Sequence, residues 1–432
     1  MANYNPNSTN YVHSYEPNTE NLVKAMDYNN LGQPIIRTVS YSSGNDTGID
    51  AFGRQQVAQP FTLFDSSMVG ADNGKFDTSS AGGASTTYNV NESSLSMTVA
   101  GTENDQVVRQ SYRTFPYQPG KALEILSTFS MATAATGLRQ RVGYFTTNNG
   151  VYFEQDGETI YMVLRSYVTG SIVETRVAQD SWNVDKFDGT GSSGITLDIT
   201  KSNIFYIDME WLGVGSVRTG FFVNGSLIIA HTFHNANITS DTTYMTSAEQ
   251  SIRYEITNTA DTGSSATMKQ ICSTVISSGG YQGRSQSVFA GRGLTYYNLT
   301  PAFTFYNLVS IRLRTAGINK VVVPNGLNII SDSNQNIHYK LLLNATPSTG
   351  FVYTNSSTFV ESSTTSASIT GGTQIGEGFI TNKGEPVKLE AADLFAYQLG
   401  RTIAGVSDIL TIAVAADSNN TQVGGGISWY EL

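Results

Sequence analysis

Hydrophobic and polar residues alternate with a period of two along much of the chain, and this pattern is typical of β-strands. The alternation is clearest in residues 203–235. There Phe205 and Ile207 fall on one face of a strand, while Asp208 and Glu210 fall on the other. We therefore expect a strand that is buried on its apolar face and exposed to solvent on its polar face.

Two further strands follow at residues 217–223 and 226–233. A glycine-bearing turn at residues 212–215 precedes the first of them, and Asn224-Gly225 separates the two. Asn-Gly is the dipeptide that a type I′ hairpin turn prefers, because both of its central residues need a positive φ. The sequence thus predicts a three-stranded antiparallel meander, which needs a second sheet to cover its apolar face.

The rest of the chain repeats this texture of short strands between turn signals, at the spacing of a β-sandwich or jelly roll and not of a parallel α/β sheet. Only two short helical segments are expected, at residues 20–28 and 391–398. The further predicted strands are residues 88–90, 94–99, 105–112, 122–131, 139–146, 150–155, 159–168, 172–178, 195–200, 253–258, 268–277, 302–314, 320–324, 326–331, 337–344, 359–361, 376–380, 387–389, 409–415 and 425–432. The predicted fold class is all-β.

Changes of composition predict three parts. Residues 1–48 are rich in Asn, Ser and Tyr and cannot bury enough apolar surface to order alone, so they form either a frayed tail or an extended arm that docks on another subunit. Residues 49–290 are expected to form a jelly-roll-type β-sandwich, and residues 291–432 a second β domain. The loop-like, glycine-rich residues 279–293 mark the boundary between them.

Charge and hydropathy exclude two classes of partner. The chain has 25 Lys and Arg against 35 Asp and Glu, with no run of like charge, so the basic stripe of a nucleic-acid-binding protein is missing. No stretch approaches the roughly 18 apolar residues of a membrane span. The first ten residues lack the basic and apolar regions of a signal peptide, so we expect synthesis in a cytoplasm without export by the usual route.

Several stretches resemble a family of virion structural proteins of tailed bacteriophages, frequent in marine and cyanobacterial phages. The likeness covers most of the chain from about residue 20 onward and consists of strand and turn motifs without a catalytic residue. The stretches are DAFGRQQVAQPFTLFDSS at 50–67, RQSYRTFPYQPGKALEIL at 109–126, RQRVGYFTTNNGVYFEQDG at 139–157, residues 181–221, RYEITNT at 253–259, ITGGTQIGEGFITNKGE at 369–385 and YQLGRTIAGVSDILTIA at 397–413.

The resemblance implies a non-enzymatic component of the virion, assembled in the host cytoplasm with capsid, neck or tail proteins as partners. It leaves open a head decoration or cement protein and a fibre or collar element. We expect attachment through the N-terminal arm and a homo-oligomer, with a trimer favoured because jelly-roll virion proteins commonly assemble around threefold axes. The alternative is a tail-associated adhesin that binds a host surface glycan.

The residues that commonly bind metals are few and scattered. Of four histidines, His231 and His234 are three apart, and on a strand such a pair points to opposite faces, which excludes a shared metal without a bend. The other two are His13 and His338. The single cysteine, Cys272, excludes an intramolecular disulfide and is expected to be a buried strand thiol because Ile271 and Val275 flank it.

Acidic residues offer two alternatives to a purely structural role. Asp208 and Glu210 share a strand face and lie about 6–7 Å apart by strand rise, within the range of a glycosidase pair, although on an exposed face they are surface charges. Asp185 and Asp188 lie in the glycine-rich loop 185–194, which has oxygen ligands for calcium but lacks the dense Asp spacing of an EF-hand.

Other motifs of catalysis or nucleotide binding are missing from the sequence: there is no G-x-S-x-G elbow, no P-loop and no dinucleotide fingerprint. Tyr296, Tyr297 and Tyr306 could stack on a sugar, or else lie in the core or at a subunit interface. We therefore expect no enzymatic activity and no catalytic, cofactor-binding or metal site.

Overall fold

The three-dimensional structure is a computed structural model. It describes residues 13–14, 23–24, 27–28, 34–35, 49–54, 58–239, 241–280, 286–332, 334–347, 358–381, 387–388 and 397–432. The chain separates into a unit of residues 1–49 and a unit of residues 50–432.

In the first unit the structure describes two short antiparallel pairs. One joins β1 (His13–Ser14) to β2 (Val23–Lys24), and the other joins β3 (Asp27–Tyr28) to β4 (Pro34–Ile35). The helical turn predicted at residues 20–28 is wrong at β2 and β3, because these residues pair with neighbouring strands. The remainder of the predicted arm lies outside the described residues.

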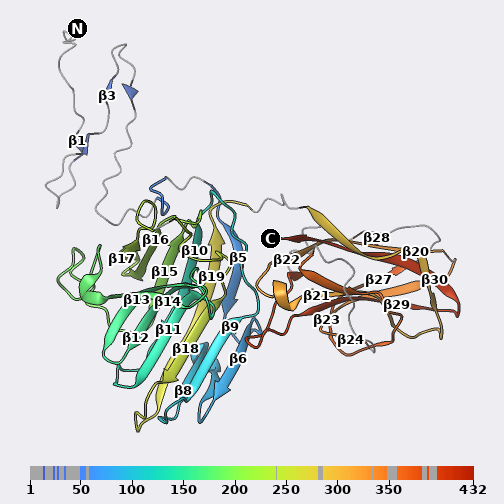
Figure 1. The fold of residues 1–432 in the computed structure, drawn as a ribbon, viewed down its shortest axis with the longest axis horizontal. Coiled ribbons are helices and arrows are strands. Elements are labelled where there is room, and N and C mark those ends of the chain that lie inside the picture. Colours follow the sequence, from blue (N-terminus) through green and yellow to red (C-terminus); the bar gives the residue numbers. More distant parts are fainter. Residues whose placement is uncertain are drawn as a thin grey trace. The chain divides into compact units, whose positions relative to one another are not determined.

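The second unit begins with a sandwich whose first layer is an eight-stranded antiparallel sheet (Figure 1). The predicted meander is confirmed: its three strands are consecutive, and Asn224 and Gly225 turn between two of them with φ of 53° and 79°. In order across the sheet, the strands are β17 (Ser226–Phe233), β16 (Val217–Val223), β15 (Asn203–Met209), β10 (Leu123–Ser130), β19 (Ala266–Ser277), β8 (Ser94–Val99) and β7 (Ser85–Asn89), with β5 (Phe61–Ser67) also paired to β19.

The second layer is a seven-stranded antiparallel sheet that covers the first, as the meander requires. Its strands, in order, are β14 (Val173–Ala178), β13 (Thr159–Ser166), β12 (Gly150–Asp156), β11 (Leu138–Phe145), β18 (Ile252–Asn258), β9 (Gln106–Ser111) and β6 (Phe76–Ala81). One continuous hydrophobic core fills the space between the two sheets.

Aromatic rings link the two layers at the centre of this core. Phe153 on β12 is fully buried, and its ring centroid lies 5.9 Å from that of Phe129, 5.8 Å from Phe205 and 5.3 Å from Phe221. These three partners belong to β10, β15 and β16 of the opposite sheet. Trp182, from the loop after β14, packs edge-on against Phe153 at 6.5 Å.

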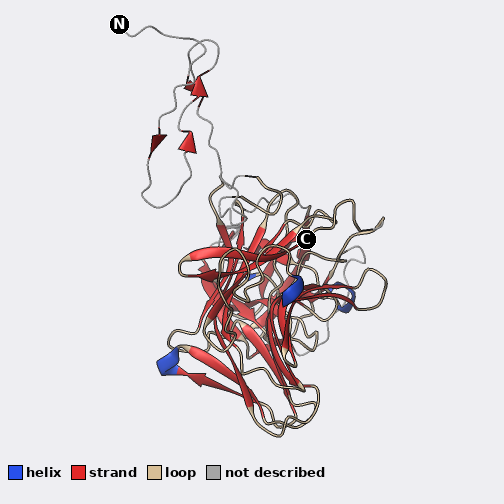
Figure 2. Ribbon diagram, turned by 90° about the vertical axis from the view of Figure 1, so that its left-hand side faces the viewer, coloured by secondary structure: helices blue, strands red, loops and turns tan. Residues whose placement is uncertain are grey.

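The remaining strands form further antiparallel sheets around a second core that contains Trp429. Figure 2, with strands in red and helices in blue, shows how strongly strands predominate. The four-stranded sheet is β20 (Ser287–Leu299), β30 (Thr421–Glu431), β22 (Val322–Ser331) and β28 (Val387–Lys388). The five-stranded sheet is β25 (Val360–Ser363), β21 (Tyr306–Leu313), β29 (Ile409–Ala416), β23 (Ile337–Leu343) and β27 (Thr373–Ile380), and β24 (Thr346–Pro347) pairs with β26 (Ile369–Thr370).

The all-β prediction is confirmed. Besides strands and loops, the described part of the chain contains only short 3₁₀ turns, at Val90–Glu92, Gln179–Ser181, Thr315–Gly317 and the single residue Tyr397. No helix among the described residues is long and apolar enough to cross a membrane. The helix predicted at residues 391–398 lies, except for its last two residues, outside the described residues.

Two local predictions are wrong for identifiable reasons. Residues 195–200 are a loop with a single bridge from Thr196 to Asp188, because the Asp198 carboxylate accepts hydrogen bonds from the backbone N–H and hydroxyl of Thr200 and closes a turn. The glycine-rich segment taken for a loop contains β20. Gly291 lies opposite Gly426, and their missing side chains allow the two backbones to approach closely.

Candidate functional site

The carboxylates predicted on an exposed strand face are both buried. Asp208 and Glu210 are each 0% exposed, so the expectation that β15 is buried on only one face is wrong. The apolar face packs into the core as predicted, whereas Arg218 and Arg54 cover the polar face. A polymer substrate cannot contact two carboxylates that have no accessible surface.

Residues 50–54 together with Glu210 form a closed arrangement that we call the clasp. The Arg54 guanidinium lies 2.6 Å from Glu210 Oε1 and 2.7 Å from Asp50 Oδ2. Asp50 Oδ1 in turn accepts hydrogen bonds from the backbone N–H groups of Phe52 and Arg54. The Phe52 ring lies so close to Gly215 that a Cβ there would come within 2.9 Å of it. The clasp thus fixes the segment that starts at Asp50 to the turn after β15.

Asp208 has an unusual electrostatic environment. Arg218 donates to its Oδ2 from Nη2 at 2.6 Å and from Nε at 3.0 Å, while its buried Oδ1 has no hydrogen-bond partner among the described residues. Burial raises the pKa of Asp208 to about 7, because the desolvation of the carboxylate outweighs the attraction of Arg218. Glu124, the residue opposite on β10, raises this pKa further.

We predict that Asp208→Asn changes how stability depends on pH. The folded-state pKa of about 7 lies above the ordinary value of 3.8, so between about pH 4 and 7 the folded protein binds more protons than the unfolded chain, and the stability of the wild type falls as pH rises. Relative to the variant, the wild type should lose up to about 1 kcal/mol per pH unit. Urea unfolding at pH 4, 5, 6 and 7 measures this, and a constant difference between the two proteins would contradict it.

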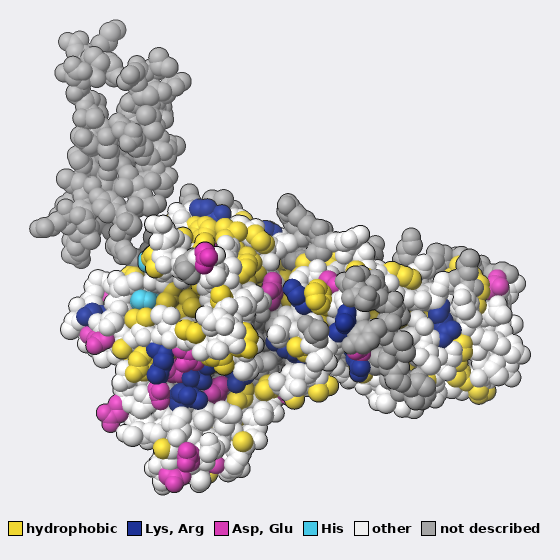
Figure 3. Space-filling model, in the orientation of Figure 1, with side chains coloured by type: hydrophobic (Ala, Val, Ile, Leu, Met, Phe, Trp, Pro, Cys, Tyr) yellow, Lys and Arg dark blue, Asp and Glu magenta, His cyan; other side chains and the backbone are white. Residues whose placement is uncertain are grey.

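The outer face of the seven-stranded sheet carries a second cluster, the ion-pair network, visible as blue and magenta side chains over β11 to β14 (Figure 3). At its centre, Arg141 Nε lies 2.5 Å from Glu154 Oε2, and Arg141 Nη1 lies 3.4 Å from Glu255 Oε1. Both carboxylates are buried. The other members are Arg139, Asp156, Arg165, Glu174, Arg176 and Arg253.

The Tyr152 side chain packs against the ion-pair network on the same face of the sheet. The Arg141 guanidinium lies 5.4 Å from the ring centroid of Tyr152, whose hydroxyl donates to Glu174 at 2.7 Å. Burial alone would raise the pKa of Glu255, but the nearby Arg253 and Arg141 lower it to about 2. A glycosidase needs one carboxylic acid with a raised pKa, and Glu255 is shifted in the opposite direction.

The acidic loop after β14 is closed by its own hydrogen bonds. Asp185 Oδ1 accepts from the N–H of Phe187, and Oδ2 accepts from the N–H of Ser193 at 2.7 Å and the hydroxyl of Ser192. No group of three or more His, Cys, Asp or Glu side chains suitable for a metal occurs in the described ranges. Asp185 therefore acts here as the acceptor that shapes the loop.

His231 and His234 differ in burial and do not form a pair of metal ligands. His231 is buried on β17, and its Nδ1 accepts a hydrogen bond from the N–H of Asn183 at 3.3 Å, whereas His234 follows the strand and is exposed. Burial, with a smaller effect from His234, lowers the pKa of His231 to about 4, so it is neutral at physiological pH. The prediction of a buried thiol is wrong, because Cys272 is exposed.

Of the three tyrosines proposed as a sugar-stacking surface, Tyr306 lies in the core, while Tyr296 and Tyr297 on β20 are half-buried. Tyr306 is buried in the second core, with its hydroxyl donating to the carbonyl of Thr300, and Tyr297 packs edge-on against it at 5.4 Å. Exposed aromatic rings occur elsewhere, at Phe303 and Phe379. Phe303 stands beside Phe305 and Tyr306 in the sequence, and this cluster was the available signal for it. Phe379 belongs to no such cluster, and its only signal was the alternation of Gly378 and Phe379 on a strand.

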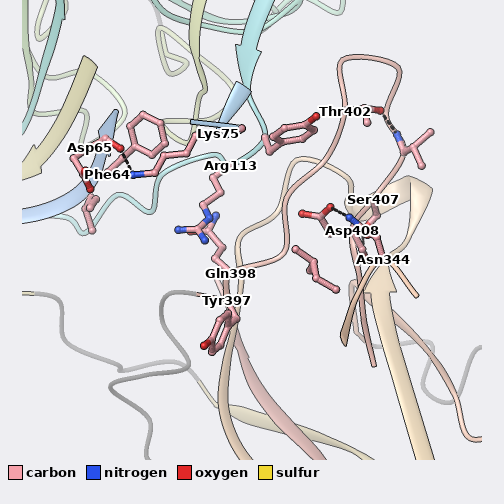
Figure 4. Close-up of a pocket in the computed structure, with 15 residues that line it drawn as sticks. Phe64, Asp65, Lys75, Arg113, Asn344, Tyr397, Gln398, Thr402, Ser407 and Asp408 are labelled. Atoms are coloured by element: carbon pink, nitrogen blue, oxygen red, sulfur yellow. Dashed lines mark hydrogen bonds and ion pairs between the residues drawn. The ribbon is translucent and has the colours of Figure 1, made fainter. Parts of the chain in front are cut away.

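A cavity of about 500 Å³ lies where Tyr397–Asp408 runs beside Tyr112–Thr114 (Figure 4). The Arg113 side chain extends toward Gln398 and Tyr397. Burial lowers the pKa of Arg113, and Asp408 and Asp65 oppose this effect. Asp408 accepts hydrogen bonds from the N–H of Gly400 and the amide of Asn344, and Lys75 is paired with Asp65. Two cations thus face two carboxylates, and the charges of the cavity wall balance.

Comparison with known proteins shows similarity in structure alone. No protein-family model and no curated protein matches the chain. Similar solved structures include a β-glucanase of Bacillus licheniformis (13% identity, TM-score 0.32, covering 51% of this chain and 98% of the other) and a family 16 glycosyl hydrolase of Mycobacterium smegmatis (10%, 0.35, 50% and 100%). The two antiparallel sheets and the core between them show by themselves that the first part of the second unit is a β-sandwich. Another similar structure is the CBM2 module of the evolved Dit of Lactobacillus casei BL23 phage J-1 (8%, 0.35, 52% and 99%).

Proposed function

We propose that the protein is a non-enzymatic structural component on the surface of a tailed-phage virion, attached through its N-terminal arm, residues 1–48. The stretches that resemble virion proteins support this, because their described residues belong to the framework of the fold. Residues 139–157 are the hairpin of β11 and β12, which contributes Arg141 and Glu154 to the ion-pair network and Phe153 to the core. A surface component of a particle needs such a framework more than it needs a reactive site.

The observation that carries the proposal is the clasp. The chain leaves the arm at Asp50, and within five residues it is tied to the turn that follows β15 by the ion pair of Arg54 with the buried Glu210. A pulling force on the arm is therefore transmitted through the clasp to the central meander and not to an unattached loop. This is the attachment that a protein held on a particle by its arm requires.

Deleting residues 1–45 should abolish incorporation into particles and leave the rest folded. Both hydrophobic cores consist of residues from 63 onward, so the unfolding temperature of the truncated chain should match that of the full chain. The test adds either form to particles that lack the protein and measures the bound fraction after sedimentation. Equal incorporation of the two forms would refute attachment through the arm.

The proposal also covers the oligomeric state of the protein and its position on the virion. It includes a homo-oligomer, with the trimer as the favoured form, and partners among the capsid, neck or tail proteins. The position we favour is on the virion surface, as a head decoration or cement protein or as a fibre or collar element.

A second candidate function is that of a tail-associated adhesin that binds a host surface glycan. One observation favours it. Phe303 is 80% exposed and Phe379 is 63% exposed, and both line the same groove with polar side chains at its rim. Solvent-exposed aromatic rings of this kind are a common feature of ligand-binding surfaces.

A further inference from the structure

A groove of about 210 Å³, which we call the aromatic groove, crosses the outer face of the five-stranded sheet. Its floor includes Ala415 on β29, a residue too small to fill the space between its neighbours. Phe303 and Phe305, just before β21, contribute to the lining, as do His338 on β23 and Phe379 on β27. The depression therefore results from a small residue on a strand bordered by large rings.

The rings in the groove are held in place. His338 and Phe379 are directly opposite on paired strands and stack face to face, with centroids 4.4 Å apart and planes within 14°. Phe305 packs edge-on against His338 at 5.1 Å, and Lys340 lies over the Phe305 ring at 4.6 Å. Since one face of Phe379 is supported by His338, its exposed surface is presented on a preformed platform.

Phe303 is held at a conformational cost. Its φ of 60° is in the left-handed region, which bulky side chains rarely occupy, and its N–H donates to the carbonyl of Ala416 at 2.8 Å. At this strained position the Phe303 ring is 80% exposed. Strain maintained at a concave surface is a feature of ligand-binding sites.

Polar groups line one end of the groove. Asn336 Nδ2 donates to Asp417 Oδ2 at 2.8 Å, and both residues are exposed. An amide and a carboxylate side by side offer N–H donors and oxygen acceptors, and a sugar hydroxyl is both a donor and an acceptor. His338 is further paired with Glu377 at 3.1 Å.

We propose that the aromatic groove binds a neutral pyranose ring of a glycan, with the C–H face of the sugar on Phe379 and its hydroxyls toward Asn336 and Asp417. The negative faces of aromatic rings attract the positively polarised C–H groups of such a ring. The inference rests on the second function proposed above, glycan binding, and assigns it a site.

The charges beside the aromatic groove and the volume of the groove restrict which sugars it can bind. The carboxylates of Asp417 and Glu377 disfavour an acidic sugar, and Lys340 is already placed over Phe305. The volume of 210 Å³ is below the roughly 300–1,000 Å³ of pockets that enclose a drug-sized ligand. The groove therefore accommodates a single ring, such as a terminal residue of a longer glycan, and its affinity for isolated sugars falls in the millimolar range.

Saturation-transfer NMR on the full chain tests the site, with methyl α-glucoside, methyl α-mannoside, methyl β-galactoside and N-acetylglucosamine as probes and glucuronate as the acidic comparison. We expect at least one neutral probe to bind more tightly than glucuronate. Phe379→Ala and Phe303→Ala should each weaken that binding at least tenfold. The matched control is Phe289→Ala, which removes a ring that is 58% exposed and does not line the groove, and should stay within twofold of the wild type.

Two results would contradict the proposal. The first rejects only the site, and the second rejects both the site and the glycan-binding function. If a neutral probe binds equally well to the wild type and to both groove variants, the site is wrong while glycan binding by the protein stands. If none of the four neutral probes binds, and an array of bacterial surface glycans is also negative, the site and the adhesin function both fail. Unfolding temperatures close to that of the wild type confirm that the variants are folded.

Discussion

Replacing Arg141 by methionine should destabilise the first sandwich by about 3–5 kcal/mol, because it removes one partner from a buried ion pair. The Arg141 side chain is only 8% exposed, and Glu154 is fully buried beside it. Arg176 would still contact the other oxygen of Glu154. Among the described residues, however, Oε2 would lose its only close cation, and Glu255 would lose one of three arginines. The cost is therefore that of a buried charge without its full set of partners.

Urea unfolding followed by tryptophan fluorescence measures this change. The matched control is Lys201→Met, which likewise replaces the cation of an ion pair by methionine. In the Lys201–Asp198 pair the lysine side chain is 79% exposed, and Nζ lies 3.6 Å from Oδ2. That variant should lose about 0.5 kcal/mol or less, because solvent screens such pairs. If both variants lose equally little, the network contributes nothing through its burial.

Phe153→Ala should cost a similar amount, about 3–5 kcal/mol, for a different reason. The ring contacts three phenylalanines from three strands of the opposite sheet, so its removal leaves a cavity that neither sheet can close alone. Phe153→Leu should recover more than half of the loss, since leucine fills most of the space. The same unfolding experiment serves, with Phe289→Ala as the exposed control, expected within about 0.5 kcal/mol of the wild type. A loss below about 1 kcal/mol for Phe153→Ala would mean that the surrounding side chains collapse into the space.

Local signals were sufficient to predict the meander, because its information lies within residues 203–235: alternation defines the strands, and Asn224-Gly225 defines the hairpin. The same alternation correctly separated the two faces of β15. It did not show that the polar face is buried: Asp208 is covered by Arg218 on the neighbouring strand, whereas Glu210 is covered by Arg54, more than 150 residues earlier in the chain. Whether a carboxylate is a surface charge or part of a clasp is thus decided by a distant contact.

Cys272 shows a second limit. Along β19, Met268 and Gln270 are buried, and so are Ser273 and Val275, so the alternation changes phase between the two pairs. The cause is a β-bulge opposite Ser127–Phe129 of β10, which inserts an extra residue and turns Cys272 outward. A strict period of two carried across the bulge gives the wrong face, and nothing in the local composition marks the position.

The aromatic groove was still harder to predict from the sequence than the burial of Glu210 or the exposure of Cys272. Its rings come from segments around residues 303, 338 and 379, and only the register of β23 against β27 brings His338 onto Phe379. The sequence does show that Gly378 and Phe379 fall on opposite faces of a strand. It does not show that a small alanine on β29 lies between them and the rings that precede β21.

The position of β19 also has a consequence for biosynthesis. β10 pairs with one edge of β19, while β5 and β8 share its other edge end to end, yet β19 is the last of these strands in the chain. At about 5–20 residues per second, a ribosome needs on the order of 10–40 s to translate the roughly 200 residues between β5 and the end of β19. During that interval β5 and β8 emerge before their common neighbour exists. The nascent chain therefore carries unpaired strand edges, which are prone to aggregation, until Ser277 has left the ribosomal tunnel.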